Sequence, residues 1–338
     1  NKNIDEESLA ALQDAYLRDL NSKRARVATL VRSDTVEIKR VKEGDAAVVK
    51  EDGKGGYVIE VPPGRGFDDV LDDIWKHQKR KLGPGAVRPV IGMTSIGTSA
   101  AVFTTTASYM PEADGRLHAM CHSVPGAWHT MGVMLSGGAS MRWLAGVLAP
   151  LAGDDALPKI AALAAESPAG ARGLIFLPYL SGERMPHNDP DARAAFIGLS
   201  TEHTIGDIAR AVMEGVAFNL REILDITRAT GAAVDEMRLI GGGARSDIWP
   251  RIVADVYEMP VTLLESEEGT AIGAALLAAT GAGAFSSVQE AADSCVRAGR
   301  EVEPRAETAE VYREQYARFL RGYGATRAVS NRPAVSPD

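Results

Sequence analysis

Residues 237–256, MRLIGGGARSDIWPRIVADV, decide the fold of this chain. An apolar run leads into three consecutive glycines and an amphipathic run follows them, which predicts a strand, a turn and a helix. Glycine loses more backbone entropy on folding than any other residue, so Gly241, Gly242 and Gly243 are unfavourable unless the turn needs a positive φ or a close backbone approach. A phosphate-bearing ligand that lies against the backbone would supply such a need.

The composition excludes several classes of function. The chain has 338 residues, of which 45% are hydrophobic and 24% charged, and this is enough for two domains with cores. Its net charge of −8 argues against a nucleic-acid-binding surface, because such proteins need an excess of Lys and Arg. No apolar run approaches the length of a membrane span, about 20 residues. We therefore expect a cytoplasmic protein with a small-molecule partner, and neither nucleic acid nor membrane as a partner.

The cysteines and histidines do not predict a metal site. Cys121 and Cys295 are far apart and lack CxxC spacing, so they predict neither a disulfide framework nor a zinc site. His118, His122 and His129 cluster around Cys121, but no carboxylate or second cysteine stands at ligand spacing. We expect these side chains to pack in the core and loops, and we assign no metal ligand.

Charge divides the chain near residue 82. Residues 1–82 carry 16 basic and 16 acidic side chains, so the whole net charge of −8 belongs to the remainder. We expect this first part to be a small α+β segment. Its expected elements are helices over 5–26 and 66–82 and strands over 35–41, 46–52 and 57–61.

From residue 83 onward, strand-like and helical stretches alternate. The strand-like stretches are 90–106, with a turn inside it, 129–136, 237–240 and 261–265, and the helical stretches are 141–152, 205–230, 246–257 and 269–280. This order predicts an α/β domain over 83–327 with a mainly parallel sheet covered by helices. Residues 328–338 are expected to form a disordered tail.

The triple glycine fits neither of two common phosphate motifs. A P-loop needs GxxxxGK[ST] and a dinucleotide fold needs GxGxxG, but no Lys follows these glycines at that spacing and Ser246 replaces the last Gly. A helix that starts near Ser246 or Asp247 can still present backbone N–H groups and a positive dipole end to a nucleotide. A tight turn without a ligand is the alternative.

Three further glycine-containing loops support the prediction of a phosphate-bearing ligand. Gly97, Thr98 and Ser99 in SIGTSA can offer N–H and hydroxyl donors to phosphate oxygens. LSGGAS at 135–140 opens a helix with two glycines, and EEGTAIGAALLA at 267–278 places two glycines one helical turn apart. Four such features in one α/β unit predict a nucleotide site.

The GTSAA sequence around Ser99 also approaches the GxSxG nucleophile elbow of hydrolases. Such an elbow passes from a strand into a helix, whereas AAVFTTT after Ser99 favours a strand. We therefore do not expect a hydrolase.

Residues 83–325 resemble a known family. AAFIGLSTEHTIGDIARAVMEG, with Ala194, Phe196, Gly198 and Asp207, resembles the second signature of the FGGY carbohydrate kinases. CHSVPGAWHTMGVMLSGGASMRWL, FLPYLSGERMPHNDPDARAAF and LIGGGARSDIWPRIVADV resemble the xylulose kinases within that family.

The resemblance implies the ribonuclease H-like, actin-like ATPase C-terminal lobe of such a kinase, which binds ATP with Mg²⁺. The implied reaction transfers a phosphoryl group to a primary hydroxyl of a ketopentose, converting D-xylulose to D-xylulose 5-phosphate. The implied ATP-binding residues are Gly97, Thr98 and Ser99 at the phosphate turn, Gly138 and Arg142 beside the nucleotide, and Gly241, Gly242, Gly243 and Asp247 near the adenosine.

The chain departs from the family pattern before the SIGTS loop. Relatives carry the catalytic base as the Asp of a GGGD motif there, whereas this chain reads DDIWKHQKRKLGPGAVRP, where Asp72 and Asp73 lack the glycines. Residues 1–82 also show no DxGT loop of a first lobe. The catalytic residue is therefore unassigned. The alternative function is a non-catalytic nucleotide-binding or interaction module, and a homodimer is left open.

Some polar side chains are expected to be structural or solvated. The long predicted helix has core spacing, and its Glu214 and Arg221 are expected in solvent. In the GERMPHND segment, residues 182–189, the resemblance implies that His187 can face the cleft of the family fold, and Glu183 and Arg184 can equally form a structural ion pair.

Overall fold

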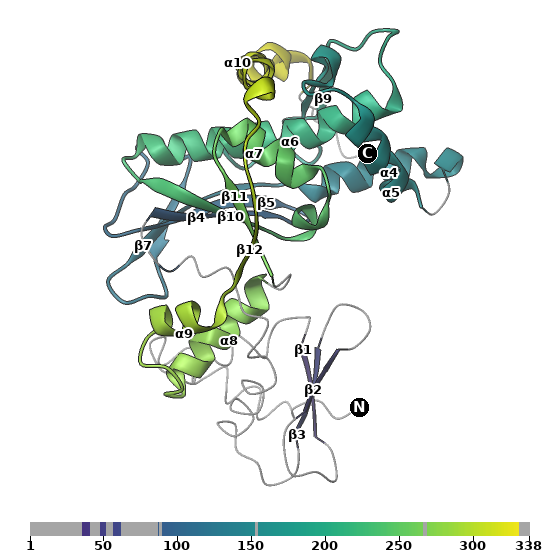
Figure 1. Cartoon of the computed structure of the whole chain (residues 1–338). Helices are drawn as coiled ribbons and strands as arrows, with labels where there is room; N and C mark the ends of the chain where they lie inside the picture. The colour runs from purple at the N-terminus through teal and green to yellow at the C-terminus, as the bar shows by residue number, and fades with distance from the viewer. Residues whose placement is uncertain are drawn as a thin grey trace, which may run out of the picture. The chain divides into compact units, whose positions relative to one another are not determined.

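The computed structural model describes residues 36–40, 48–51, 57–61, 87, 90–152, 155–265 and 269–330 (Figure 1). The chain divides into two compact units, and each is described separately. The first unit comprises residues 1–87 and 265–297, and the second comprises residues 88–264 and 298–338. No described helix is both long enough and apolar enough to cross a membrane.

The first unit contains the three strands predicted near the start of the sequence. They are β1 (Val36–Arg40), β2 (Val48–Glu51) and β3 (Tyr57–Val61). Their sheet has the order β1-β3-β2, in which β1 is parallel and β2 antiparallel to β3. The helices predicted over 5–26 and 66–82, with Asp72 and Asp73, lie outside the described residues.

Two helices, α8 (Gly269–Gly281) and α9 (Val288–Cys295), also belong to the first unit. They pack together through Ile272 and Leu276 of α8 and Ala291 of α9, which are buried. The helix predicted over 269–280 is therefore confirmed.

A seven-stranded sheet forms the centre of the second unit. Its strands are β4 (Val90–Ile96), β5 (Ala100–Thr106), β6 (His118–Cys121), β7 (Trp128–Met134), β10 (Val234–Ile240), β11 (Val261–Leu264) and β12 (Ala298–Val302). In the order β12-β11-β10-β4-β5-β7-β6, only the neighbouring pairs β11–β10 and β10–β4 are parallel. The mainly parallel sheet expected from the sequence is wrong, because β4, β5, β6 and β7 follow one another along the chain without the crossover helix that parallel neighbours need.

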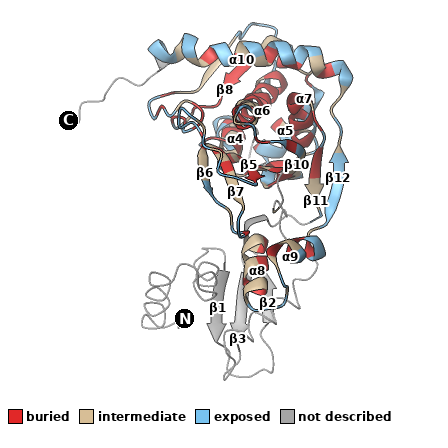
Figure 2. Cartoon of the chain, turned by 90° about the vertical axis from the view of Figure 1, so that its left-hand side faces the viewer, coloured by how far each residue is buried: buried red, intermediate tan, exposed pale blue. Residues whose placement is uncertain are grey.

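Helices cover this sheet in two layers. They are α4 (Gly138–Ala152), α5 (Ala156–Glu166), α6 (Ile205–Ala229), α7 (Trp249–Tyr257) and α10 (Ala309–Ser330). Figure 1 shows α6 and α7 over one face of the sheet, and Figure 2 agrees that α10 lies outside them. The antiparallel pair β8 (Ile175–Leu177) and β9 (Ala195–Ile197) packs against α6 and α10. Most residues of α6 are buried, which corrects the sequence prediction for its polar positions.

Glu214 is the clearest of these corrections. It was expected in solvent, but it is 1% exposed, because α6 packs against the sheet on one side and α10 on the other. Arg221 is also partly buried, and its guanidinium donates to the carbonyl oxygen of Val256 and lies 3.2 Å from Asp225 Oδ1. Neither side chain is free in solvent.

A capping box starts α6. Thr204 Oγ1 accepts a hydrogen bond from the backbone N–H of Asp207 at 3.3 Å, and Asp207 Oδ2 accepts one from the Thr204 N–H at 2.8 Å. We expect Thr204→Ala to lower the free energy of unfolding by about 1 kcal/mol, as measured by urea denaturation. Thr201→Ala, at an exposed position three residues earlier, is the control. Equal losses in the two variants would contradict a stabilising role for the cap.

Candidate functional site

Three loops leave the same edge of the seven-stranded sheet. β4 and β10 are parallel neighbours, and Ser95 is paired with Ile240 where both strands end. Both β4 and β7 are antiparallel to β5, so β7 also ends at this edge, where Met134 is paired with Ala100. The loops are the β4–β5 turn (97–99), the β7–α4 loop (135–137) and the β10–α7 loop (241–248).

Backbone hydrogen bonds join the β4–β5 turn to the start of α4. Gly138 N–H donates to the Gly97 carbonyl at 2.7 Å, and Ala139 N–H donates to the Thr98 carbonyl at 3.0 Å. A Cβ on Gly138 would lie 2.5 Å from the Gly97 carbonyl oxygen, so only glycine allows this approach. These two N–H groups are used within the protein, which leaves the hydroxyls of Thr98 and Ser99 as the exposed side-chain donors of the turn.

The β10–α7 loop packs on the end of β4. Gly241 has φ +86°, and a Cβ there would lie 2.7 Å from the Ile96 carbonyl oxygen. A Cβ on Gly243 would lie 2.6 Å from Ile96 Cβ. Packing therefore accounts for two of the three consecutive glycines. Gly242 is different, because it is exposed and a Cβ there would meet nothing within 4 Å.

The remaining predicted site residues surround this edge of the sheet. Arg142 lies one turn into α4, where its Nη1 is 3.9 Å from a Cβ placed on Gly138. Arg142 and Asp247 are both exposed. Gly269 and Gly273 belong to the first unit, so the second unit holds three of the four glycine loops.

The helix after the triple glycine starts later than predicted. It begins at Trp249 rather than at Ser246 or Asp247, because residues 242–245 first form a 3-10 turn. Ser246 Oγ then accepts hydrogen bonds from the N–H groups of Ile248 at 3.4 Å and Trp249 at 3.2 Å. This start is capped from within the chain, which makes it a weaker anion site than the sequence suggested.

Two alternatives from the sequence can now be compared with the geometry. Ser99 is followed directly by β5, so the chain passes from strand to strand and lacks the strand-to-helix turn of a nucleophile elbow. His129 stacks on Phe103 with ring centroids 4.6 Å apart, and His122 Nδ1 accepts the N–H of Val124 at 3.0 Å. Burial lowers the pKa of His129. Within the described ranges no three metal-ligating side chains gather.

The sequence profile described as the FGGY family of carbohydrate kinases, C-terminal domain, matches residues 92–282. This match covers more than half of the chain. The chain belongs to the FGGY family of carbohydrate kinases. The three loops of the second unit all lie within its FGGY domain.

Proteins of similar sequence match the same part of this chain. A xylulose kinase from Staphylococcus epidermidis is 36% identical over 74% of this chain and 50% of its own length. A xylulose kinase from Escherichia coli is 33% identical over 78% of this chain and 53% of its own length. The crystal structure of xylulose kinase from Rhodospirillum rubrum is 34% identical, with a TM-score of 0.65, and the match covers 81% of this chain and 52% of that chain. The α/β, actin-like ATPase lobe expected from the sequence is confirmed, and the chain spans about half the length of the curated relatives it matches.

The GERMPHND segment of this FGGY domain contains a buried carboxyl group that the sequence did not reveal. Glu183 is 1% exposed and accepts backbone N–H groups, while the Arg184 guanidinium lies 3.0 Å from His118 Nε2. The expected ion pair between Glu183 and Arg184 is not among the ion pairs of the described residues. His187 stacks on Tyr323 of α10 at 3.7 Å. Burial lowers the pKa of His187 to about 4, so this histidine is neutral at physiological pH.

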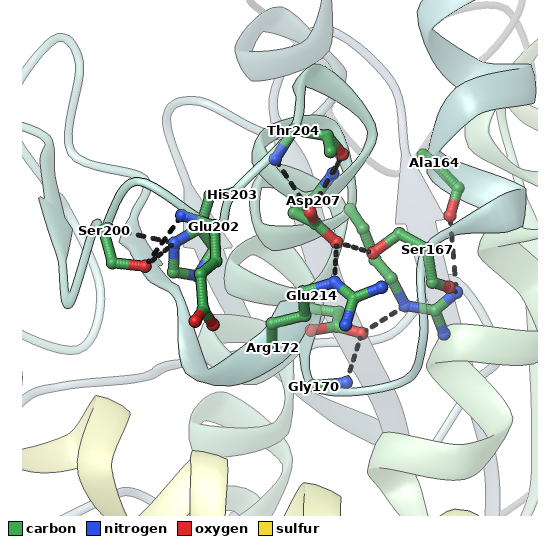
Figure 3. A network of polar contacts seen from close by, with 11 residues as sticks. Ala164, Ser167, Gly170, Arg172, Ser200, Glu202, His203, Thr204, Asp207 and Glu214 are labelled. Carbon is green, nitrogen blue, oxygen red and sulfur yellow. Dashed lines mark hydrogen bonds and ion pairs between the residues drawn. The ribbon is translucent and has the colours of Figure 1, made fainter.

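A buried polar network joins the segment after α5 to α6, as Figure 3 shows, and Tyr312 extends it to α10. Glu214 Oε1 accepts hydrogen bonds from Arg210 Nε at 2.7 Å, Tyr312 Oη at 2.9 Å and Gly170 N at 3.0 Å. Arg210 Nη1 also donates to the Ser167 carbonyl at 2.7 Å. Burial raises the pKa of Glu214, and the Arg210 guanidinium opposes that rise. The i,i+4 spacing of Arg and Glu was the sequence signal for this pair.

Proposed function

We propose that this chain carries the ATP-binding lobe of a carbohydrate kinase within residues 83–327 and serves the ATP-dependent phosphorylation of a ketopentose. The observation that carries the proposal is the convergence of three loops at one sheet edge, beside exposed hydroxyl groups and a guanidinium group. D-xylulose, converted to D-xylulose 5-phosphate, is the proposed substrate because relatives of 33–36% identity are xylulose kinases. The proposal includes a cytoplasmic location. It allows a homodimer as an alternative to a monomer.

The exposed groups at this edge suit a nucleotide. The hydroxyls of Thr98 and Ser99 would donate to phosphate oxygens, and Arg142 would supply positive charge beside them. The open space next to Gly242 would accept the adenosine, with the Asp247 carboxylate as a hydrogen-bond acceptor for its hydroxyls. Mg²⁺ would enter with the ATP phosphates, whose oxygens are ligands that it prefers.

Turnover also needs a base for the sugar hydroxyl. Phosphoryl transfer depends on positioning, on stabilisation of the phosphate charge and on a group that accepts the hydroxyl proton. The described residues supply candidates for the first two, while Asp72 and Asp73 lie outside them. A non-catalytic nucleotide-binding module is therefore the second candidate.

A coupled ADP-release assay with D-xylulose separates the two candidates. ATP-dependent turnover that disappears in an Asp72→Asn/Asp73→Asn double variant would support the enzyme. ATP binding in calorimetry without turnover would support the module. An absence of ATP binding would contradict both candidates.

Gly242→Val tests the location of the nucleotide. We expect ATP affinity to fall at least about tenfold, because the added side chain would fill the space proposed for the ligand. The melting temperature should not change, since a Cβ on Gly242 meets nothing within 4 Å. Gly324→Val on α10 is the matched control, because a Cβ there also meets nothing within 4 Å. Equal ATP affinities of the two variants in calorimetry would contradict a role of the β10–α7 loop in ATP binding.

A further inference from the structure

Two buried side chains of the second unit each leave an oxygen without a hydrogen-bond donor. Glu183 is 1% exposed and Asn219 of α6 is 0% exposed. Glu183 Oε2 and Asn219 Oδ1 have no hydrogen-bond partner among the described residues. Buried polar atoms are nearly always satisfied, because an unsatisfied one keeps its full desolvation penalty. Two such atoms in one region therefore need an explanation.

Both side chains are bound to the same residue, Met185. Glu183 Oε1 accepts the Met185 N–H at 3.3 Å, and Asn219 Nδ2 donates to the Met185 carbonyl at 3.3 Å. Met185 lies in a turn, and the two groups bind the N–H and the C=O of this one residue. The carboxyl and amide groups therefore both lie beside the Met185 backbone.

The hydrogen bonds already made fix which atoms remain. The Met185 carbonyl is an acceptor, so the Asn219 amide must present Nδ2 to it and keep Oδ1 for another partner. All three N–H donors to Glu183, from Leu135, Arg184 and Met185, bind Oε1. Two acceptor oxygens cannot bond to each other unless one of them carries a proton. A protonated Oε2 would satisfy both atoms at once.

The surroundings of Glu183 favour the neutral acid. Burial raises the pKa of Glu183 to about 8, the backbone N–H groups oppose the rise, and the Glu222 carboxylate of α6 adds to it. Glu222 is the titratable side chain that acts on this carboxyl, and burial raises the pKa of Glu222 to about 7. Burial raises the pKa of the Tyr179 hydroxyl, and Glu183 adds to that rise. Leu135, which donates to this carboxyl from the end of β7, is uncharged, and so is Asn219 of α6, which binds the same residue, Met185.

Glu183 also contacts the candidate nucleotide site. The Leu135 N–H, which donates to Glu183 Oε1 at 3.4 Å, belongs to the loop that leads from β7 to Gly137 and Gly138. We propose that Glu183 is a positioning residue, whose protonated carboxyl donates Oε2–H to Asn219 Oδ1 while Oε1 holds Leu135 N–H and so fixes the β7–α4 loop against the β4–β5 turn. Its effect on nucleotide binding rests on the proposed function, whereas its protonation does not.

Paired substitutions test the role in binding. Glu183→Gln reproduces the neutral acid, because its amide oxygen can accept the three N–H groups and its NH₂ can donate to Asn219. We expect ATP affinity within twofold of wild type for Glu183→Gln and at least tenfold weaker for Glu183→Ala. Loss of affinity in Glu183→Gln as large as in Glu183→Ala would overturn the proposal, because it would show that the charged carboxylate is needed.

Two measurements without ATP test the protonation itself. At pH 7 we expect the wild-type infrared spectrum to contain a band of a protonated carboxyl group. This band should be missing from the spectrum of Glu183→Gln. The folded pKa of Glu183, about 8, lies above the unfolded value of 4.5. Its contribution to the free energy of unfolding is therefore full below about pH 4.5 and is lost as the pH rises from there through about 8. The melting temperature of wild type should therefore fall relative to Glu183→Gln over that window. The proposal would be overturned, even if ATP binds, if the band is absent and the difference in melting temperature between wild type and Glu183→Gln does not change with pH. If wild type shows both the infrared band and the pH-dependent difference in melting temperature but does not bind ATP, the protonation of Glu183 is supported. That result would contradict only the proposed nucleotide site.

Discussion

Arg210→Ala is expected to lower the free energy of unfolding by about 3–5 kcal/mol, as measured by chemical denaturation. The Arg210 side chain is 5% exposed, and it donates to Glu214 Oε1 at 2.7 Å, to the Ser167 carbonyl at 2.7 Å and to Tyr312 Oη at 2.9 Å. Its removal leaves a buried carboxylate without a counter-charge. It also leaves the Ser167 carbonyl, just after α5, without this donor, so two penalties add together.

Two further variants make this result specific. Arg172→Ala removes a guanidinium that is 56% exposed and lies 3.4 Å from Asp207 Oδ1, so its loss should stay below about 1 kcal/mol. Arg210→Met combined with Glu214→Leu removes both charges and should recover much of the stability. If Arg210→Ala costs no more than Arg172→Ala, the buried network is not a major source of stability.

Gly138→Ala is expected to weaken ATP binding about a hundredfold, or roughly 2.7 kcal/mol. The new Cβ would lie 2.5 Å from the Gly97 carbonyl oxygen, which is the acceptor of the Gly138 N–H. Because the conflict is with backbone, the β4–β5 turn must move, and Thr98 and Ser99 move with it. Overpacking of this kind should also lower the free energy of unfolding by about 1–3 kcal/mol.

Gly146→Ala makes the same chemical change on the same helix. A Cβ on Gly146 meets nothing within 4 Å, so this variant should keep its ATP affinity. It should gain up to about 1 kcal/mol of stability, since alanine favours helix over glycine. Calorimetry and denaturation of both variants give the comparison. Unchanged ATP affinity in Gly138→Ala would show that the approach of α4 to the turn does not shape the nucleotide site.

The sequence predicted the elements better than their directions. The pattern around residues 237–256 identified β10 and α7, and the strand-like stretch at 90–106 became β4 and β5. Hydrophobic periodicity carries no information about strand direction, so the antiparallel half of the sheet was missed. The short turn at 97–99 was the available signal, because three residues can only reverse a chain.

The glycines were predicted to lie together, and the structure gives three of them a packing role that the sequence did not reveal. Gly138, Gly241 and Gly243 were interpreted as surfaces for a ligand, whereas each permits close contact with the β4–β5 turn or the end of β4. A composition rule cannot distinguish a glycine that faces a ligand from one that faces a neighbouring loop. Among the three consecutive glycines, Gly242 alone keeps open space next to its backbone.

Buried carboxyl groups were the main features that the sequence concealed. Glu214 binds Tyr312, 98 residues further along the chain, and Glu183 binds Leu135, 48 residues earlier. An amphipathic pattern assigns a glutamate to the polar face of its own helix or loop. Its burial is decided by distant segments, which local periodicity does not describe.

The outer strands of the seven-stranded sheet, β6 and β12, have a consequence for how this protein behaves at high concentration. They are four and five residues long, and β12 exposes Arg300 and Glu301. Short outer strands, and charged side chains such as those of β12, discourage a foreign strand from extending the sheet. Concentrated preparations should therefore resist fibril-like stacking of copies through the outer strands of this sheet.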